Sequence, residues 1–233
     1  MWKLIKEKKL SAKQNMELDK KHLEQIKEKD APLLHFYSWE KPSATYGVFM
    51  KPQELFKRTD ALDLAQRPTG GGVLFHLWDL AFSVIVPVGH PGYSTDILKN
   101  YKFVNDAVLD AVKRVLKEGV SASLLPVEPT ALSALSKYFC FAKPTKYDVM
   151  IDGKKIAGAA QRWKKNGYLH QGSISIAAPS FDFLERILPV DAKLTEAMKL
   201  NTYYFLNAPS QSEFLDAQES LKRHLTNALH ERG

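Results

Sequence analysis

The chain of 233 residues contains a single cysteine, Cys140, so no disulfide can form within it. A reducing compartment is the simplest environment for such a chain, and we expect a cytoplasmic protein. No apolar run approaches the ~18 residues that a membrane-spanning helix needs, so no membrane association is predicted. The first ten residues scatter charges among apolar side chains, which is not the pattern of a secretory signal.

Common nucleotide and nucleic-acid signatures are missing as well. The glycines at 70–72 are not followed by Gly-Lys-Ser/Thr and do not match G-x-G-x-x-G, which excludes both phosphate-loop motifs. Neither cysteine/histidine finger spacing nor a basic run with interleaved aromatics occurs, so we expect no nucleic-acid partner. The net charge is +7, from 33 Lys and Arg against 26 Asp and Glu. The early lysines fit a solvated helix face, or attraction to an acidic protein partner.

The apolar pattern predicts a mixture of helices and strands without regular βαβ alternation. No internal repeat, low-complexity tract or linker interrupts it, and we expect one domain over residues 1–233. Helices are predicted over 11–29, 94–118, 181–188 and 211–229, and strands over 33–37, 44–49, 80–86, 147–151 and 169–177. Gly47 predicts a bulge or a close backbone approach, and Asp152-Gly153 predicts a hairpin turn. This pattern favours an α+β fold with a mixed, largely antiparallel sheet packed with helices.

A run of three glycines is the first candidate for chemistry. In Arg67-Pro-Thr-Gly-Gly-Gly-Val-Leu-Phe-His76, the missing Cβ atoms let the backbone approach a ligand and point N–H groups at an anion or a carbonyl oxygen. Arg67 lies beside this loop, where its guanidinium could bind a carboxylate or phosphate. The alternative is a flexible turn that precedes the strand at 80–86.

A lysine beside small residues is the second candidate. Lys155 follows the Asp152-Gly153 turn and is itself followed by the small residues of Ile-Ala-Gly-Ala-Ala-Gln161. Small side chains next to a lysine leave room for a thin ligand to lie against the backbone. The alternative is a solvent-exposed lysine on an edge strand, which is the common state of a lysine.

The lone cysteine is the third candidate. A free cysteine is usually a buried core residue, and Cys140 could be one. A nucleophilic Cys140 would need nearby positive charge to stabilise its thiolate. His76 and His170 could act as bases, and each could equally be a structural histidine.

Taken together and in this order, these segments resemble the superfamily of lipoate–protein ligases, octanoyltransferases and biotin ligases over nearly the whole chain. The most specific signatures are Arg67-Pro-Thr-Gly-Gly-Gly72 and Lys155-Ile-Ala-Gly-Ala-Ala-Gln161. Asn15-Met-Glu-Leu-Asp19, His35-Phe-Tyr-Ser-Trp39, Ala44-Thr-Tyr-Gly-Val-Phe49 and Leu169-His-Gln-Gly-Ser173 support the resemblance. It implies the catalytic-domain fold of that superfamily.

Two chemistries compete within the superfamily. ATP-dependent lipoate ligases follow the glycines with His-Asp-x-Gly-Asn, whereas His76-Leu-Trp-Asp-Leu80 lacks the Gly-Asn pair. The chain after Pro189 is also too short for the full C-terminal accessory domain of long ligases. Cysteine-dependent octanoyltransferases carry Cys-Phe-x-x-Pro-Ser-x-Tyr, which Cys140-Phe-Ala-Lys-Pro-Thr-Lys-Tyr147 resembles. Gly72 stands where that group usually has an arginine, which weakens the preference for the transferase without reversing it.

The resemblance implies roles for particular residues. Cys140 would accept the acyl group as a thioester, and Lys155 would donate hydrogen bonds to the acyl carbonyl and help with proton transfer. The expected substrate-binding residues are Arg67, Thr69, Gly70, Gly71, Gly72, His76, Tyr147, Gly158, Ala159 and His170. The glycine loop and Ala159 would shape a narrow acyl tunnel. We expect no metal ligand and, for the transferase, no cofactor, whereas a ligase would use ATP and magnesium.

The resemblance also implies the partners. The acceptor would be a lysine of a lipoyl-carrier domain, either in the E2 subunit of a 2-oxoacid dehydrogenase or in the glycine cleavage H protein. Acyl carrier protein would be the octanoyl donor. Three alternatives stay open: an ATP-dependent lipoate ligase, an inactive relative that binds the carrier domain or an acyl ligand, and a biotin ligase, which the cysteine and loop sequences fit less well.

Overall fold

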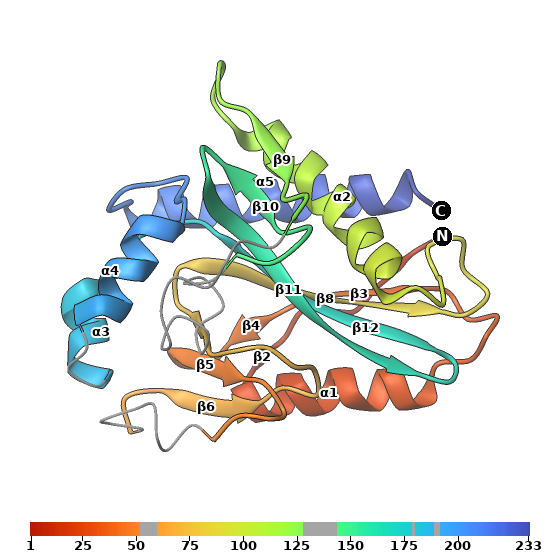
Figure 1. The fold of residues 1–233 in the computed structure, drawn as a ribbon. Helices are drawn as coiled ribbons and strands as arrows, with labels where there is room; N and C mark the ends of the chain where they lie inside the picture. Colours follow the sequence, from red (N-terminus) through yellow and green to blue (C-terminus); the bar gives the residue numbers. More distant parts are fainter. Residues whose placement is uncertain (52–59, 128–143, 179, 189–191) are drawn as a thin grey trace.

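A seven-stranded sheet forms the centre of the computed structural model, which describes residues 1–51, 60–127, 144–178, 180–188 and 192–233 (Figure 1). Its strands, in spatial order, are β1 (Lys3–Leu4), β3 (Leu33–Phe36), β8 (Asp79–Pro87), β12 (Gly167–Ser175), β11 (Lys154–Lys164), β10 (Val149–Ile151) and β9 (Ala122–Leu124). Only the β1–β3 pair is parallel, and the other neighbours in this sheet are antiparallel. The sheet is therefore largely antiparallel, as predicted.

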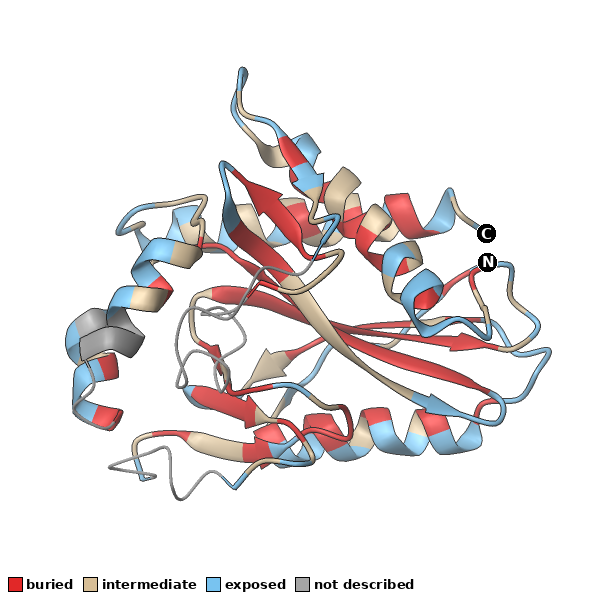
Figure 2. Cartoon of the chain, in the orientation of Figure 1, coloured by how far each residue is buried: buried red, intermediate tan, exposed pale blue. Residues whose placement is uncertain are grey.

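Two long helices cover one face of this sheet. Helix α2 (Ile97–Val115) and helix α5 (Gln211–His230) pack against each other and against the sheet. Their apolar stripes meet alternate side chains of β8 and β12, because successive residues of a strand point to opposite faces. The resulting core is continuous and includes Val108, Val112, Leu225, Phe82 and others. Figure 2 shows the buried residues concentrated in the central strands and along the inner sides of both helices.

The opposite face carries helix α1 and a smaller sheet. Helix α1 (Ala12–Gln25) begins at Ser11, whose side chain accepts a hydrogen bond from the Gln14 backbone while the Gln14 side chain accepts one from the Ser11 backbone. The three-stranded sheet contains β6 (Asp63–Gln66), β5 (Ser43–Tyr46) and β7 (Leu74–His76). A further short pair joins β2 (Lys9–Leu10) to β4 (Ser38–Trp39). Helices α3 (Phe181–Ile187) and α4 (Ala192–Asn201) lie together at one end of the molecule (Figure 1), and they pack against Phe75 of β7.

The predicted elements are confirmed, with ends that differ by up to four residues. Helix α2 begins at Ile97, after its cap Asp96, and ends at Val115 rather than at Glu118. Helix α1 ends at Gln25 rather than near Lys29, because Ile26 leaves the helical conformation to join the buried cluster beneath the sheet. The hairpin turn at 152–153 is confirmed, since both of its residues have positive φ, 48° and 75°.

Two structural details differ from the sequence-based expectation. Tyr147, predicted as the first residue of a strand, has a φ of 67° and precedes β10, which begins only at Val149. Strand β5 ends at Tyr46, and Gly47 follows it. The close approach predicted at Gly47 is confirmed there, because an added Cβ would lie 2.1 Å from the carbonyl oxygen of Gly71.

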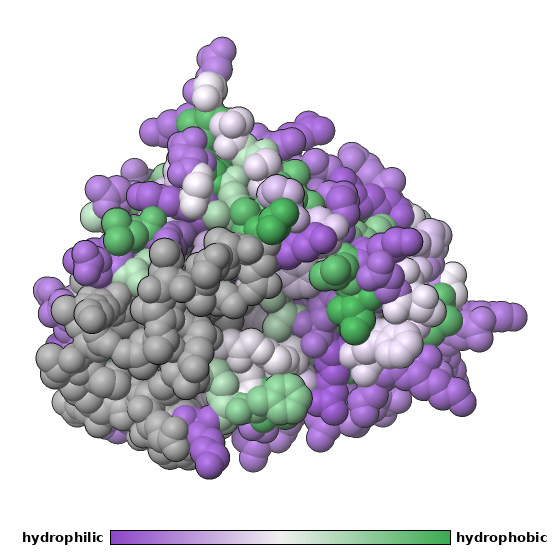
Figure 3. All heavy atoms as spheres, in the orientation of Figure 1, coloured by the Kyte–Doolittle hydropathy of each residue, from purple (hydrophilic) through white to green (hydrophobic). Residues whose placement is uncertain are grey.

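No described helix is long and apolar enough to cross a membrane. Among the described residues on the face drawn in Figure 3, hydrophilic ones are the more numerous, and the hydrophobic ones lie in separate groups.

Candidate active site

A buried ion pair lies at the start of β11. Lys155 Nζ lies 2.8 Å from Asp148 Oδ2, and the side chains of the two residues are 5% and 0% exposed. A charge so deeply buried needs a partner of opposite sign, because desolvation otherwise costs several kcal/mol. The alternative of a solvent-exposed lysine is therefore wrong. In the structure, Asp148 instead fixes the position of the Lys155 ammonium group.

Several donors hold the Asp148 carboxylate in turn. The Thr145 backbone N–H and hydroxyl bond to Oδ2 at 2.6 and 3.0 Å, and the Tyr101 hydroxyl donates to Oδ1 at 2.9 Å. The Tyr101 oxygen also lies 2.9 Å from the backbone nitrogen of Ala159. Burial, and then the charge of Asp148, raise the pKa of Tyr101 well above its usual value. Tyr101 therefore stays a neutral hydroxyl that joins helix α2 to the carboxylate and to strand β11.

Gly158 provides the space for the lysine. A Cβ built on Gly158 would lie 2.4 Å from Lys155 Nζ, 2.3 Å from its Cε and 2.7 Å from Asp148 Oδ1. The ammonium group thus occupies the volume of a missing side chain. The small residues after the lysine are predicted to leave space, and Gly158 leaves the space that the Lys155 ammonium group fills.

The glycine loop, residues 70–72, is held by Arg67. Its guanidinium donates to the carbonyl oxygens of Gly70 and Gly72 at 2.9 and 2.8 Å, and to the Thr45 carbonyl and hydroxyl at 2.9 Å each. Arg67 is only 4% exposed. The sequence places this guanidinium beside the loop, where it could bind a carboxylate or phosphate, and in the structure it also holds the loop in shape. Gly71 has a φ of 88°, which a side chain would strain.

The loop lies against the same face of the β11–β12 hairpin as the lysine. The Arg162 guanidinium donates to the Pro68 carbonyl at 2.8 Å, and the Thr69 hydroxyl donates to Gln171 Oε1 at 2.7 Å. Gln171 pairs with Ala160, and Gly158 is two residues earlier on β11. Residues 158, 160 and 162 share one face of the strand, because its side chains alternate. Strand register thus brings together two segments that lie far apart in the sequence.

His76 belongs to a buried chain of hydrogen bonds beside the loop. Its Nε2 lies 2.8 Å from the Thr45 hydroxyl and its Nδ1 lies 2.9 Å from Asp79 Oδ2. Ser173 donates to the same Asp79 oxygen at 2.6 Å, and the Trp39 ring stacks on His76 at 4.4 Å. Thr45 also accepts from Arg67, so this chain connects to the glycine loop.

His170 lies on the opposite face of β12, fully buried between the Phe82 and Tyr101 rings. Its Nδ1 lies 3.0 Å from the Gln161 amide, whose oxygen accepts that proton in the better-satisfied orientation. Burial lowers the pKa of His170 to about 3. His170 is therefore a neutral histidine in the interior and is poorly suited to act as a base near neutral pH.

The remaining predicted residues have different outcomes. Tyr147 is half-buried, and its carbonyl accepts a hydrogen bond from Asn105 at 2.7 Å. This bond holds the turn that leads to Asp148. Cys140 lies outside the described residues. The structure therefore brings together Lys155, Gly158 and the Arg67–glycine segment on one face of the hairpin, while the side chains of Ala159 and His170 lie on its other face.

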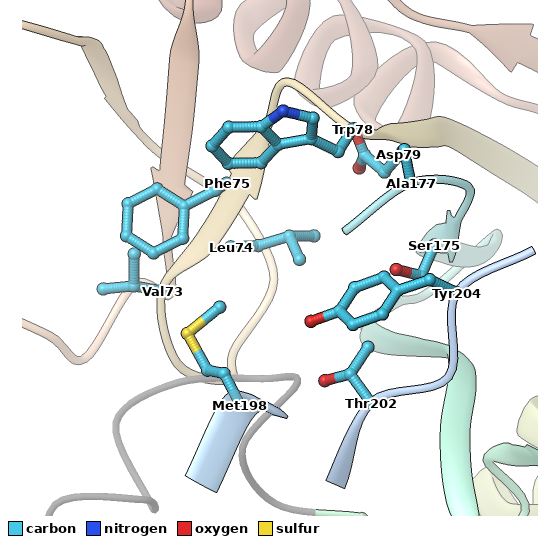
Figure 4. A pocket seen from close by; sticks show the side chains of 10 residues that line it. All are labelled: Val73, Leu74, Phe75, Trp78, Asp79, Ser175, Ala177, Met198, Thr202 and Tyr204. Atoms are coloured by element: carbon cyan, nitrogen blue, oxygen red, sulfur yellow. The ribbon is translucent and has the colours of Figure 1, made fainter. Parts of the chain in front are cut away.

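An apolar cavity adjoins this arrangement (Figure 4). Its volume is about 30 Å³, which is room for about one water molecule, and its lining includes Val73, Leu74, Phe75, Trp78 and Met198. In Figure 4 the Leu74 side chain points into its middle. Asp79 and Thr202 also line it. Because Thr202 forms a β-bridge with Lys155, the cavity lies beside the strand that carries the lysine.

Sequence reasoning missed the partners of the predicted residues. Asp148 holds the lysine and Tyr101 holds Asp148, whereas Asp79 and Trp39 contact His76 and Gln171 holds the loop. Asp148 directly follows Tyr147, the last residue of the cysteine motif, and this adjacency is the one signal in the sequence that points to it. Among the described residues no group of three or more His, Cys, Asp and Glu could hold a metal ion.

The fold is that of lipoate ligases. The chain aligns with lipoate-protein ligase A bound with ATP at 25% identity and a TM-score of 0.70, over 97% of this chain and 84% of that one. A bi-partite lipoate protein ligase from Thermoplasma acidophilum, solved in a study that also covers its E2 lipoyl domain, aligns at 24% identity and a TM-score of 0.69, over 97% and 82%.

Residues 11–200 match the family of the lipoyl protein ligase A/B catalytic domain, and the chain belongs to that family. The octanoyltransferase LipM of Carboxydothermus hydrogenoformans is 28% identical over 226 residues, which cover 94% of this chain and 81% of the relative. The octanoyltransferase LipM of Geobacillus kaustophilus is 32% identical over 167 residues, which cover 69% of this chain and 60% of the relative. The predicted superfamily and fold are confirmed.

Proposed function

We propose that this protein is an acyltransferase that attaches an octanoyl group, or its lipoyl derivative, to a lysine of a lipoyl-carrier domain. The donor is octanoyl acyl carrier protein, and the acyl group passes through a thioester on Cys140. The observation that carries the proposal is the buried Lys155–Asp148 pair on the hairpin face that also supports the glycine loop. The names of the relatives favour octanoyl transfer over the other reactions of the family.

The reaction has two balanced steps. The Cys140 thiolate attacks the carbonyl carbon of the donor thioester, a new C–S bond forms, and the carrier leaves as a thiol after taking a proton. The amine of the target lysine then attacks the Cys140 thioester. A C–N bond forms, the C–S bond breaks, the nitrogen loses a proton, and Cys140 is restored as a thiolate.

Lys155 stabilises the negative charge that develops on the carbonyl oxygen in both steps. A preorganised donor in a site shielded from water is effective because it needs no reorganisation during the reaction. Asp148 and Gly158 supply this preorganisation, since one holds the ammonium group and the other leaves room for it. Arg67 contributes by holding the glycine loop, whose N–H groups face the acyl carbonyl.

The acyl chain lies against apolar surface beside the loop. The cavity around Leu74 offers such surface next to the strand of Lys155. Each buried methylene contributes about 0.8 kcal/mol before the cost of ordering the chain. The protein acts in the cytoplasm, and its net charge of +7 speeds encounter with acidic carrier domains.

A second candidate function is ATP-dependent lipoate ligation. The structural likeness to lipoate-protein ligase A bound with ATP favours it. Lys155 and the backbone of the glycine loop would hold the phosphate of the nucleotide, because N–H groups and an ammonium group suit an anion. ATP, with magnesium, would supply the activation of a free carboxylic acid. Cys140 would then be a structural residue.

Intact-mass spectrometry separates the two functions. The protein is incubated with octanoyl acyl carrier protein, without ATP and without an acceptor. We expect a mass increase of one octanoyl group that neutral hydroxylamine removes, as it removes a thioester. Cys140→Ala should form no adduct and should not modify an apo carrier domain. Cys140→Ser should give no hydroxylamine-labile adduct.

The same carrier domain is then supplied with octanoate, ATP and magnesium. If Cys140→Ala modifies the carrier domain fully under these conditions, the transferase proposal is wrong and the ligase is right. If neither donor supports modification by the wild-type protein, the chain is an inactive relative. A calorimetric titration with the apo carrier domain would then test whether it still binds.

A further inference from the structure

A buried carboxylate lies between helix α1 and the hairpin, and the proposed reaction does not use it. Asp19 of α1 is fully buried and accepts hydrogen bonds from Ser83 Oγ at 2.8 Å and from the Tyr37 hydroxyl. His35 Nδ1 lies 3.1 Å away. Gln171 Nε2 donates to Asp19 Oδ2 at 2.9 Å. A buried carboxylate with this many donors is well satisfied and stays fixed in one orientation.

The carboxylate decides the orientation of the Gln171 amide. An ionised carboxylate can only accept hydrogen bonds, so the NH₂ group of the amide must face Asp19. The amide oxygen then points the other way, where the Thr69 hydroxyl donates to it at 2.7 Å. Thr69 is 1% exposed and directly precedes the glycine loop, residues 70–72. The loop is therefore tied to helix α1 through one amide whose direction is not free.

A second contact fixes the other side of the same segment. The backbone N–H of Val48 donates to the Thr69 carbonyl at 3.0 Å. Arg67 holds the loop from within, but its contacts with Gly70 and Gly72 do not reach the hairpin. The contacts that place the loop on the hairpin are those of Thr69 with Gln171 and of Pro68 with Arg162. Of these two, the Thr69–Gln171 bond is the buried one.

We propose that Gln171 is a positioning residue, which fixes the glycine loop over the β11–β12 hairpin by donating to Asp19 and accepting from Thr69. The inference rests on the proposed acyl transfer, because the loop must meet the carbonyl that Lys155 also meets. Gln171 does not touch the reacting atoms. It acts through its amide, whose NH₂ group is bonded to α1 and whose oxygen is bonded to the segment before the loop.

The role of the amide can be tested by exchanging the amide and the carboxylate between positions 171 and 19. Gln171→Glu places two carboxylates side by side, and Asp19→Asn removes the acceptor that orients the amide. The double variant Asp19→Asn, Gln171→Glu restores the pattern of donors and acceptors. Its new amide at position 19 donates to the new carboxylate at position 171. That carboxylate also accepts hydrogen bonds from Thr69 and Tyr37. We expect each single variant to lose at least tenfold in kcat/KM for octanoyl transfer, mainly in kcat. The double variant should return to within about threefold of wild type. Gln25→Glu, an exposed change at the end of α1, is the matched control.

Hydrogen exchange of the free protein gives a readout that needs no activity. Residues 67–73 should exchange faster in both single variants than in wild type, and should regain protection in the double variant. If wild type transfers no octanoyl group, the proposed function fails, and exchange alone still decides the positioning role. Wild-type protection and full kcat/KM in Gln171→Glu would overturn the inference, as would a double variant no better than the worse single one.

Thr69 provides a test if the charged variants fail to fold. Thr69→Val keeps the shape of the side chain and loses the hydroxyl, whereas Thr69→Ser keeps the hydroxyl. We expect Thr69→Val to behave like Gln171→Glu in both assays, and Thr69→Ser to behave like wild type. Equal behaviour of the two Thr69 variants would overturn the inference.

Discussion

The fit of Lys155 into the space at Gly158 leads to a quantitative prediction for Gly158→Ala. The new methyl carbon would lie 2.4 Å from Lys155 Nζ and 2.7 Å from Asp148 Oδ1. Ordinary contact begins near 3.4 Å, so the ammonium group must move by about 1 Å. Misplacement by this amount can cost ~100-fold in rate. The corresponding loss of transition-state stabilisation is about 2.7 kcal/mol.

The effect on stability should be smaller. Adding a methyl group to a packed site costs roughly 1–3 kcal/mol, and replacing a glycine in a strand returns roughly 0.5–1 kcal/mol of backbone entropy. We therefore expect Gly158→Ala to lower the free energy of unfolding by about 0–2.5 kcal/mol while it lowers kcat/KM about 100-fold. Urea unfolding and steady-state octanoyl transfer measure the two quantities.

A double-mutant cycle identifies the clash. In a Lys155→Ala background the Cε and Nζ atoms are gone, so Gly158→Ala should cost about 1–2 kcal/mol less than it does in wild type. Lys155→Ala leaves a buried carboxylate unpaired, which is strongly destabilising. If that variant is too unstable, the cost of Gly158→Ala is measured instead in a background that combines Lys155→Ala with Asp148→Asn. Equal costs in both backgrounds, together with normal activity of Gly158→Ala, would refute the reasoning.

Arg67, His170 and Leu74 each give a further prediction. Arg67→Lys loses the planar fork that holds the glycine loop, and we expect kcat/KM to fall at least tenfold and unfolding free energy by roughly 1.5–3 kcal/mol; wild-type values of both in the same assays would contradict this. The folded pKa of His170, about 3, lies below its unfolded value of ~6.5, so its contribution to stability is present above pH 6.5 and is lost as the pH falls. Wild type should lose about 2 kcal/mol more than His170→Phe between about pH 7.5 and 5 in urea titrations, and identical slopes would show that the ring is not buried neutral. Leu74→Trp should fill the cavity and reduce octanoyl transfer, whereas Leu200→Trp, at a position 62% exposed, should leave transfer and thermal stability unchanged.

The segments that carry chemistry are recognisable in the sequence. Three consecutive glycines are rare outside places where the backbone must come close to something, and the Gly47–Gly71 contact confirms such a place. The Asp152-Gly153 turn predicts where Lys155 enters its strand, because both turn residues need positive φ. A continuous apolar run predicts β8, and apolar residues spaced by three or four predict α2. The ends of the helices differ more, since capping by Asp96 and the departure of Ile26 depend on packing.

The roles of single residues cannot be predicted from the sequence in the same way. A lysine among small residues looks alike in sequence whether it is exposed or buried, and only the Asp148 carboxylate decides that Lys155 is buried. The sequence does not show that the Arg67 guanidinium also donates to the carbonyls of its own loop. Nor does the sequence show that strand alternation turns the His170 ring to the face covered by α2.

The class of fold, the order of helices and strands, and the glycine and lysine segments thus follow from the chain's own pattern, because they depend on local geometry and on the spacing of apolar residues. Which groups meet is a matter of the three-dimensional arrangement. Asp19, Thr69 and Gln171 come from a helix, a loop and a strand, and their hydrogen bonds exist only because the register of β12 against β11 and β8 brings them together. The direction of a buried amide and the partner of a buried charge are set by such long-range contacts, since a polar group removed from water must find its partner wherever the fold places one.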